Sequence, residues 1–226
     1  MGMAADSRRI VFLALMAALG NVMFVISQTI FKMTQIALDL SHIGTLIAAV
    51  YGGPLAGLVA GLLVGIGPGI YFGYVGGSLG LLGALGLPIG KAMTGVSVGY
   101  LAKIFRVQHS KGSSWKVTFA TLIGYIPECI YTLFFFIVLV TILLPDVAAF
   151  FTSIFGSIWA LALSVLAKAW VEMALLGFFM GALVGNSGFN DFVGRVFMKT
   201  FTVQKFKQKA RKKTSLTQRI SLGHQD

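Results

Sequence analysis

Long apolar runs separated by short polar segments make up most of the chain. A helix that crosses the hydrocarbon core of a bilayer needs about 20 mostly apolar residues. Six runs fit this pattern, although the second is short and predicts a tilted or partly re-entrant helix. The predicted boundaries are about 10–28, 38–51, 54–74, 79–104, 117–144 and 155–184.

Glycines recur at every fourth position through the third run. Residues four apart lie on one face of a helix, and a glycine inside a soluble helix costs about 1 kcal/mol relative to alanine. Such a ladder favours a membrane helix, where small residues let neighbouring backbones approach closely. The glycines at the two ends of the ladder are also typical of turns. Its seven members are Gly53, Gly57, Gly61, Gly65, Gly69, Gly73 and Gly77.

The composition agrees with a membrane protein. Apolar residues make up 57% of the 226 residues and charged residues 11%, and the mean hydropathy is +0.87. A soluble domain of this size cannot bury so much apolar surface, and continuous rather than alternating runs exclude a transmembrane β-barrel. The single cysteine, Cys129, excludes an internal disulfide framework. We therefore expect an all-α polytopic protein whose first run is a retained helix rather than a cleaved signal peptide.

The positive charges predict the orientation. Of the 18 Lys and Arg residues, two precede the first helix, four lie between the fourth and fifth, and nine follow the sixth. Six helices place these 15 residues on one side, and basic flanks stay in the cytoplasm. Both termini are then cytoplasmic, with a membrane domain over residues 1–190 and a basic tail over 191–226. Attraction to anionic lipid explains the net charge of +11, so no nucleic-acid partner is expected.

A few ionisable residues remain within the apolar runs or at their edges. Charges inside a membrane are costly, so they face the bundle interior or a cavity. Lys168 and Glu172 lie four apart and can pair, which leaves two interpretations open. The charges either form internal ion pairs that only orient helices, or line a polar pocket with Trp170 as an aromatic wall. The candidate pocket residues are Lys91, Glu128, Trp170, Glu172, Lys168 and Asp39.

Sequence motifs for catalysis or for bound cofactors are missing. The chain has no GxxxxGK[ST], HExxH or GxSxG motif. His42 has no second histidine nearby, so no metal site is predicted, and His42 is interpreted as a polar residue at the start of the second helix. We expect no enzyme activity and no cofactor, and any ATP-driven work would need partner subunits.

Two segments carry a resemblance to a known family. Arg8 and Arg9 precede an apolar helix with Ala14 and Ala18 on one face, and residues 39–66 read DLSHIGTLIAAVYGGPLAGLVAGLLVGI. With the chain length and predicted topology, these resemble the substrate-binding S components of energy-coupling factor (ECF) vitamin transporters, over residues 8 to about 185. The resemblance implies a multi-pass protein of a prokaryotic plasma membrane that imports a water-soluble vitamin or related small precursor.

The resemblance also implies roles for residues and partners. Ala14 and Ala18 would dock on a transmembrane coupling subunit that two ABC-type ATPases drive. The loop over about 29–38 would lie outside and cover the substrate. Lys91 would pair with an anionic group or an acceptor atom of the ligand, and Glu128 would accept from a donor. The balance of acids and bases argues against a polyanionic substrate.

Two other functions fit the sequence less well. A stand-alone secondary transporter or channel would use the glycine ladder as a tight interface around a path, but the two halves show no internal repeat. An intramembrane enzyme would need Glu128, His42 and Glu172 to converge as an acid–base set. The spacing of these residues in the sequence does not indicate that they do.

Overall fold

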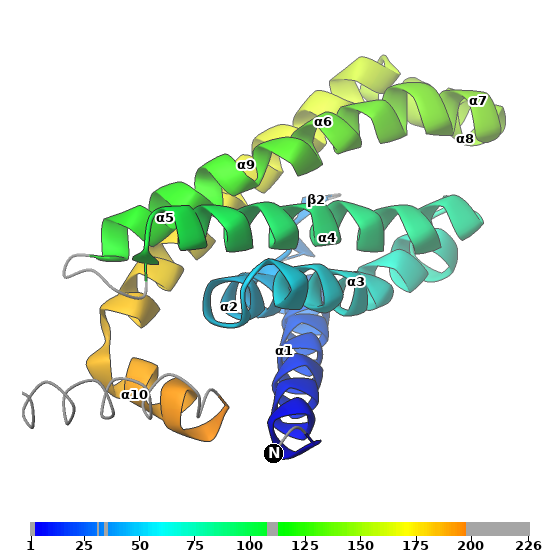
Figure 1. Cartoon of the computed structure of the whole chain (residues 1–226). Helices are drawn as coiled ribbons and strands as arrows, with labels where there is room; N and C mark the ends of the chain where they lie inside the picture. Colours follow the sequence, from blue (N-terminus) through cyan, green and yellow to red (C-terminus); the bar gives the residue numbers. More distant parts are fainter. Residues whose placement is uncertain (1–2, 31, 34–35, 108–112, 198–226) are drawn as a thin grey trace, which may run out of the picture.

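The structure is a computed structural model that describes residues 3–30, 32–33, 36–107 and 113–197. Its first half begins with helix α1 (Met3–Ile30), followed by two short antiparallel strands, β1 (Lys32–Met33) and β2 (Ile36–Ala37). Helix α2 (His42–Gly52) leads into α3 (Pro54–Ile70), which continues as the π-helical segment η1 (Tyr71–Val75). Helix α4 (Gly80–Ile104) then runs back along α3 (Figure 1).

The second half is also helical. Helices α5 (Ser113–Gly124) and α6 (Ile126–Phe134), the π-helical segment η3 (Phe135–Val140) and α7 (Thr141–Leu143) form one long stretch. Helix α8 (Pro145–Phe155) reverses the chain into the long helix α9 (Ile158–Gly185). The described part ends shortly after α10 (Ser187–Val196). The predicted all-α class is confirmed for the described residues, apart from the short strand pair.

Five helical stretches in the described part are long and apolar enough to cross a membrane. They cover Ser7–Ile30, Pro54–Val75, Gly80–Ile104, Ser113–Leu143 and Ile158–Gly185. These match five of the six predicted runs. The run predicted over 38–51 instead forms the 11-residue helix α2, which is too short for a full span. Its side chains from His42 to Tyr51 are all buried, so the apolar character of this run reflects a central position in the fold.

The glycine ladder forms the contact between α3 and α4. A Cβ atom built on Gly57 would lie 2.2 Å from the Gly95 carbonyl oxygen, and one on Gly61 would lie 2.5 Å from the Lys91 carbonyl oxygen. Gly65 and Gly69 meet Pro88 and Ala84 of α4 in the same way. Such distances leave no room for a side chain, so the close backbone approach that the ladder predicted is confirmed. The tight interface also fixes the position of Lys91, which projects from α4.

A sharp corner joins the long stretch ending at Leu143 to α9. Pro145 starts α8, where proline lacks only an N–H that has no partner in a first turn. Gly156 ends α8 with φ of 80°, a conformation that favours glycine. The Ser157 hydroxyl then accepts from the Ala160 N–H at 3.0 Å and caps α9. The corner therefore carries a helix where the sequence predicted only a connection between 144 and 155.

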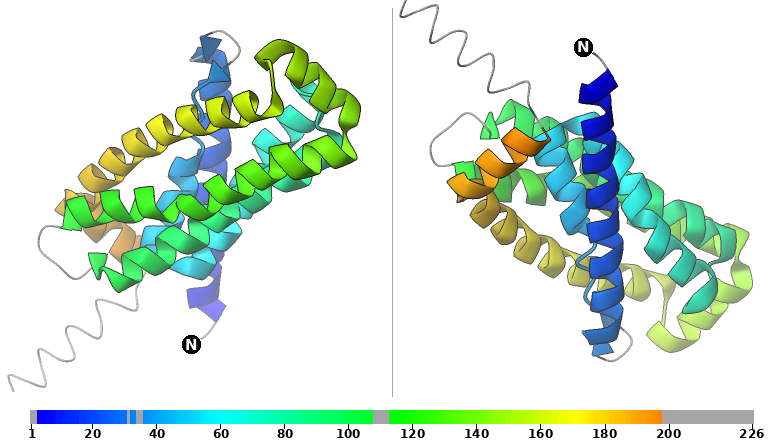
Figure 2. Two further views of the ribbon diagram at one scale, coloured as in Figure 1. Left: turned by 90° about the horizontal axis from the view of Figure 1, so that it is seen from above. Right: turned by 90° about the horizontal axis from the view of Figure 1, so that it is seen from below.

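The helices form two groups. Helices α3 and α4 lie below the α5–α6 stretch and α9, and α1 runs steeply across α2 and α3 (Figures 1 and 2). Buried side chains of α1, α2, α3, α4, α5, α9 and α10 form the larger apolar core. A smaller core gathers where η3 and α8 meet the start of α4. Two clusters around separate ends leave the middle of the molecule available for polar side chains.

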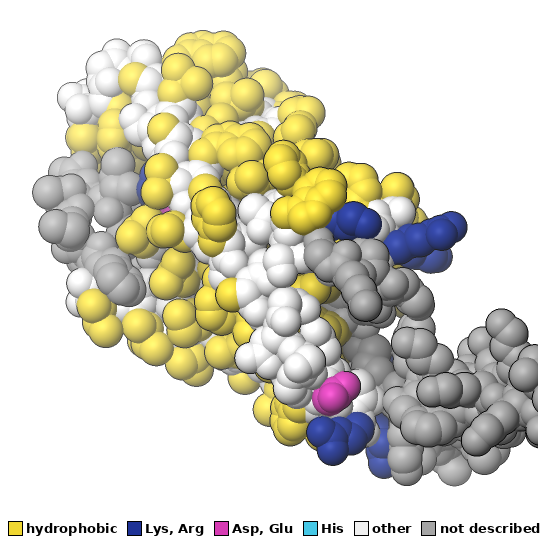
Figure 3. All heavy atoms as spheres, turned by 90° about the vertical axis from the view of Figure 1, so that its left-hand side faces the viewer, with side chains coloured by type: hydrophobic (Ala, Val, Ile, Leu, Met, Phe, Trp, Pro, Cys, Tyr) yellow, Lys and Arg dark blue, Asp and Glu magenta, His cyan; other side chains and the backbone are white. Residues whose placement is uncertain are grey.

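Apolar side chains cover much of the face shown in Figure 3, whereas Lys and Arg gather toward one side of it. Helix α10 lies beside the N-terminal half of α1, where the rings of Phe12 and Phe197 have centroids 5.1 Å apart. The predicted boundary between membrane domain and tail, at residues 190–191, falls inside α10. Residues 198–226 of the predicted tail lie outside the described residues.

Candidate functional site

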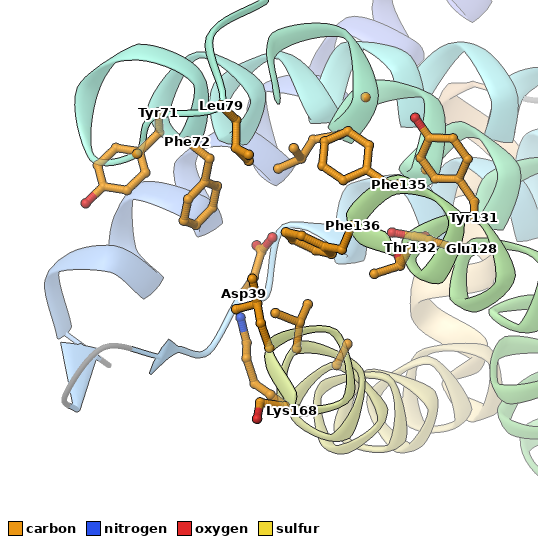
Figure 4. Close-up of a pocket in the computed structure, with 18 of the residues that line it drawn as sticks. Asp39, Tyr71, Phe72, Leu79, Glu128, Tyr131, Thr132, Phe135, Phe136 and Lys168 are labelled. Atoms are coloured by element: carbon orange, nitrogen blue, oxygen red, sulfur yellow. The ribbon is translucent and has the colours of Figure 1, made fainter. Parts of the chain in front are cut away.

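A cavity of about 540 Å³ lies between η1, the first half of α4, α6, η3, α8 and α9. Nine Tyr and Phe residues are among its lining residues, and the segment that leads into α2 closes one side. Figure 4 shows Tyr71, Phe72, Phe135 and Phe136 around the space, with the Asp39 carboxylate pointing into it. The cavity therefore combines aromatic walls with one strongly polar side, as small-molecule sites do.

Lys91 lies at the centre of the polar side. Only 3% of this residue is exposed, and its ammonium group contacts three acceptors. These are the Asp39 Oδ2 at 3.0 Å, the Ser41 Oγ at 2.7 Å and the His42 Nδ1 at 3.1 Å. A lysine carries three N–H donors, so each donor of Lys91 has a partner in the chain.

His42 connects Lys91 to Glu128. Its Nε2 lies 3.1 Å from the Glu128 Oε2, while its Nδ1 faces the Lys91 ammonium. An ammonium group can only donate, so Nδ1 is the acceptor and the proton sits on Nε2, which donates to the carboxylate. The Thr94 hydroxyl also donates to Glu128. A chain of hydrogen bonds thus links α2, α4 and α6 at the base of the cavity.

A second polar group comes from α9. The Lys168 Nζ lies 3.1 Å from the Glu172 Oε1, which confirms the pair predicted from their spacing. The same Glu172 oxygen accepts the backbone N–H of Asp39. This bond ties the segment after β2 to α9 at the edge of the cavity, which both residues line. The loop over 29–38 ends directly before this contact.

Asp39 belongs to both polar groups. Its carboxylate accepts from Lys91 and from the Ser41 N–H at 2.9 Å. Burial favours the neutral acid, but the positive charge of Lys91 and the Ser41 hydrogen bond outweigh it and lower the pKa of this carboxyl below its usual range. Asp39 is therefore an anion at neutral pH.

Five of the six predicted pocket residues meet in this cavity: Asp39, Lys91, Glu128, Lys168 and Glu172. Trp170 lies elsewhere, with 39% of its surface exposed and its ring edge-to-face with Tyr125 at 5.6 Å. Tyr125, not Trp170, lines the space. Ala14 and Ala18 lie on the exposed face of α1, away from this cavity.

Sequence reasoning missed two groups of lining residues. His42 was interpreted as an isolated polar residue, but it touches two of the predicted charges. An ionisable residue at the start of a wholly apolar helix was the available signal. The aromatic walls from η3 and α8, such as Phe135, Phe150 and Phe151, depend on the corner at Leu144, which the hydrophobic pattern did not reveal.

Among the described residues, no group of three or more His, Cys, Asp or Glu side chains is placed to hold a metal ion. No family model, no curated protein and no solved structure matches this chain. In the described part of the chain, fold and site define a helical protein with five apolar helices of membrane-spanning length and an aromatic cavity with a charged side.

Proposed function

We propose that the chain binds a small solute in this cavity, as the substrate-binding S component of an ATP-driven ECF-type importer. The observation that carries the proposal is the cavity itself. A bundle that only needed orienting ion pairs would close around them, whereas here the charged groups border about 540 Å³ of space between aromatic walls. The substrate class is a water-soluble vitamin or a related small precursor.

The position of the segment after β2, which lines the cavity through Asp39, supports a binding role. The segment after β2 is held to α9 through the Asp39 N–H bond to Glu172 and to α1 through the Leu40 N–H bond to Ser27 at 3.1 Å. The side chains of Asp39 and Ser41 also hold it to Lys91 of α4. Opening of this segment breaks these contacts but leaves the backbone hydrogen bonds inside the helices intact. In this proposal the segment admits the substrate from outside and then covers it.

The exposed face of α1 supports the coupling role. Ala14 and Ala18 lie on this face, with the apolar residues Val11, Leu15 and Val22 around them. Small residues let a second helix approach closely within a membrane. We place the coupling subunit here, with its two ATPases and both termini of this chain in the cytoplasm of a prokaryote. A stand-alone transporter or channel would need no such partner.

Mass spectrometry of small molecules released from the purified protein tests the binding role. The parent should release one compound stoichiometrically. Val165→Trp, which places a large side chain among the lining residues of α9, should release none. Leu163→Trp is the matched control, because Leu163 lies on the same helix with 58% of its surface exposed.

Equal release from all three proteins would remove the cavity from the proposal. Affinity purification from the native membrane then tests the assembly. Recovery of a coupling subunit with two ATPases supports an ECF-type importer. Release of a stoichiometric compound from a protein that carries no ATPase would favour the stand-alone transporter.

A further inference from the structure

We propose that the cavity selects a small organic cation, with its positive charge against the carboxylates of Asp39, Glu128 and Glu172 and its apolar body between the aromatic walls. This inference rests on the proposed binding function and names its substrate class. It differs from the expectation that Lys91 meets an anionic group of the ligand. Three independent observations carry it: charge, hydrogen-bonding capacity and the chemistry of the walls.

The charges that line the cavity do not balance. Three carboxylates face two ammonium groups, those of Lys91 and Lys168. Each carboxylate accepts from at least two donors, which stabilises the ionised form. His42 accepts from Lys91 through Nδ1 and is therefore neutral. With Asp39, Glu128 and Glu172 all ionised, the lining carries one net negative charge in a region of low dielectric. A cationic ligand restores neutrality there and also stabilises the ionised form of Glu172 against the cost of its burial.

The unused hydrogen-bonding capacity is on the acceptor side. All three donors of Lys91 are taken by Asp39, Ser41 and His42, so this lysine has none left for a ligand. A carboxylate has about four lone-pair positions, and those of Asp39, Glu128 and Glu172 are only partly used by the contacts described above. A ligand rich in N–H donors therefore fits better than one rich in acceptors.

Lys168 is the cation with donors to spare, since its described partner is Glu172 alone. Its position nevertheless disfavours an anion. Glu172 lies 3.1 Å from its ammonium group, and the Asp39 backbone is bonded to the same carboxylate oxygen. An anion bound to Lys168 would thus have Glu172 as a like-charged neighbour, which raises its free energy of binding.

The walls suit the body of such a cation. Tyr71, Phe72, Phe135 and Phe136 surround the space into which the Asp39 carboxylate points (Figure 4). Aromatic faces carry partial negative charge and attract organic cations, most strongly where water is excluded. The same rings bury the apolar part of the ligand. Aromatic walls next to a net negative charge favour an ammonium or a cationic heteroaromatic ring.

Three solutes that share a phenyl ring and a two-carbon chain but differ in charge test the inference. The probes are phenethylamine, 2-phenylethanol and phenylacetate at pH 7, titrated into the full-length detergent-solubilised protein by calorimetry. We expect phenethylamine, a cation at this pH, to bind at least about tenfold more tightly than the neutral alcohol, with phenylacetate weakest. Equal affinity of the cation and the alcohol, or tighter binding of the anion, overturns the inference.

Two charge variants should move the preference in opposite directions. Lys168→Gln makes the lining more negative and should increase the ratio of cation to alcohol affinity by about threefold or more. Asp39→Asn makes it neutral and should lower the ratio by a similar factor. Nonspecific damage to the fold would lower the affinities for both probes together, so only a charge effect changes the ratio with opposite signs. An unchanged ratio in both variants overturns the inference.

The outcomes separate this inference from the proposed function. Stoichiometric release of an anionic or neutral compound, lost in Val165→Trp, supports a binding subunit and overturns the cation selectivity. Failure of every probe to bind, together with no released compound, overturns both. Release of a cationic compound supports both, and its structure then gives the substrate.

Discussion

Lys91 is the residue whose surroundings differ most from what its sequence position suggests. No acidic residue lies on its own helix, yet it meets Asp39, Ser41 and His42 from the segment around the start of α2. A buried charge is tolerated only when it is paired and hydrogen-bonded. Lys91 is therefore the point at which α2 is attached to α4, in addition to any effect on the ligand.

Removal of the Lys91 charge should destabilise the protein strongly. Lys91→Met leaves the Asp39 carboxylate without its cation, and breaking a buried ion pair from one side costs about 3–5 kcal/mol. Thermal unfolding in detergent measures the effect as a lower Tm. Lys103→Met is the matched control, because Lys103 is exposed in the last turn of the same helix and the loss should be much smaller.

The double variant Lys91→Met with Asp39→Asn distinguishes the Tm loss caused by the broken ion pair from the loss caused by changed packing. It removes both charges, so it should recover part of the Tm that Lys91→Met loses, because the unpaired anion is gone. Additive losses in the double variant would contradict the role assigned to this ion pair.

At the scale of the element, the apolar runs predicted the long helices well. Residues 54–74, 79–104 and 155–184 correspond closely to α3 with η1, α4 and α9, because spans of this length need continuous apolar sequence. The run at 38–51 was harder to interpret. A helix buried on all sides by protein and one surrounded by lipid have the same composition, so the pattern alone could not distinguish α2 from a membrane span.

The sequence identified which charged residues lie within the apolar runs, but not which residues they contact. Ionisable residues in apolar runs are few, and their cost in lipid marks them individually. Which of them meet depends on how α2, α4, α6 and α9 pack, and the sequence does not contain that information in any local pattern. Trp170 and Tyr125 illustrate this, since both are aromatic residues within apolar runs and only Tyr125 reaches the cavity.

The α3–α4 interface gives a test at the same scale. Gly57→Ala would place a methyl group 2.2 Å from the Gly95 carbonyl oxygen, so the two helices must separate. Overpacking of this kind costs about 1–3 kcal/mol and should lower the Tm. Gly194→Ala in α10 is the control, because a Cβ there meets nothing within 4 Å, and it should leave the Tm unchanged or raise it. Equal Tm values for the two variants would contradict the close approach.

At the scale of the whole molecule, the cavity and the exposed face of α1 are separate surfaces. The cavity is enclosed mainly by α4, α6, η3, α8 and α9, whereas α1 packs on α2 and α3 and leaves Ala14 and Ala18 exposed. The link between them is the segment from the end of α1 to Asp39. The proposed importer would use this arrangement, because one surface would hold the solute while the other engages the coupling subunit that the two ATPases drive.

A bulky residue on α1 should therefore separate docking from binding. Ala14→Trp and Ala18→Trp both place a large ring on the exposed face of α1 and should reduce recovery of the coupling subunit in affinity purification from native membranes. Release of the bound solute should stay at the level of the parent, because neither alanine lines the cavity.

Ile130→Trp is the control, since Ile130 is 64% exposed on α6 and lies on a different helix. If both alanine variants recover the partner as well as the parent does, this face of α1 is not the docking surface. A loss of bound solute in the same variants would instead mean that α1 shapes the cavity, and the two surfaces could no longer be treated as independent.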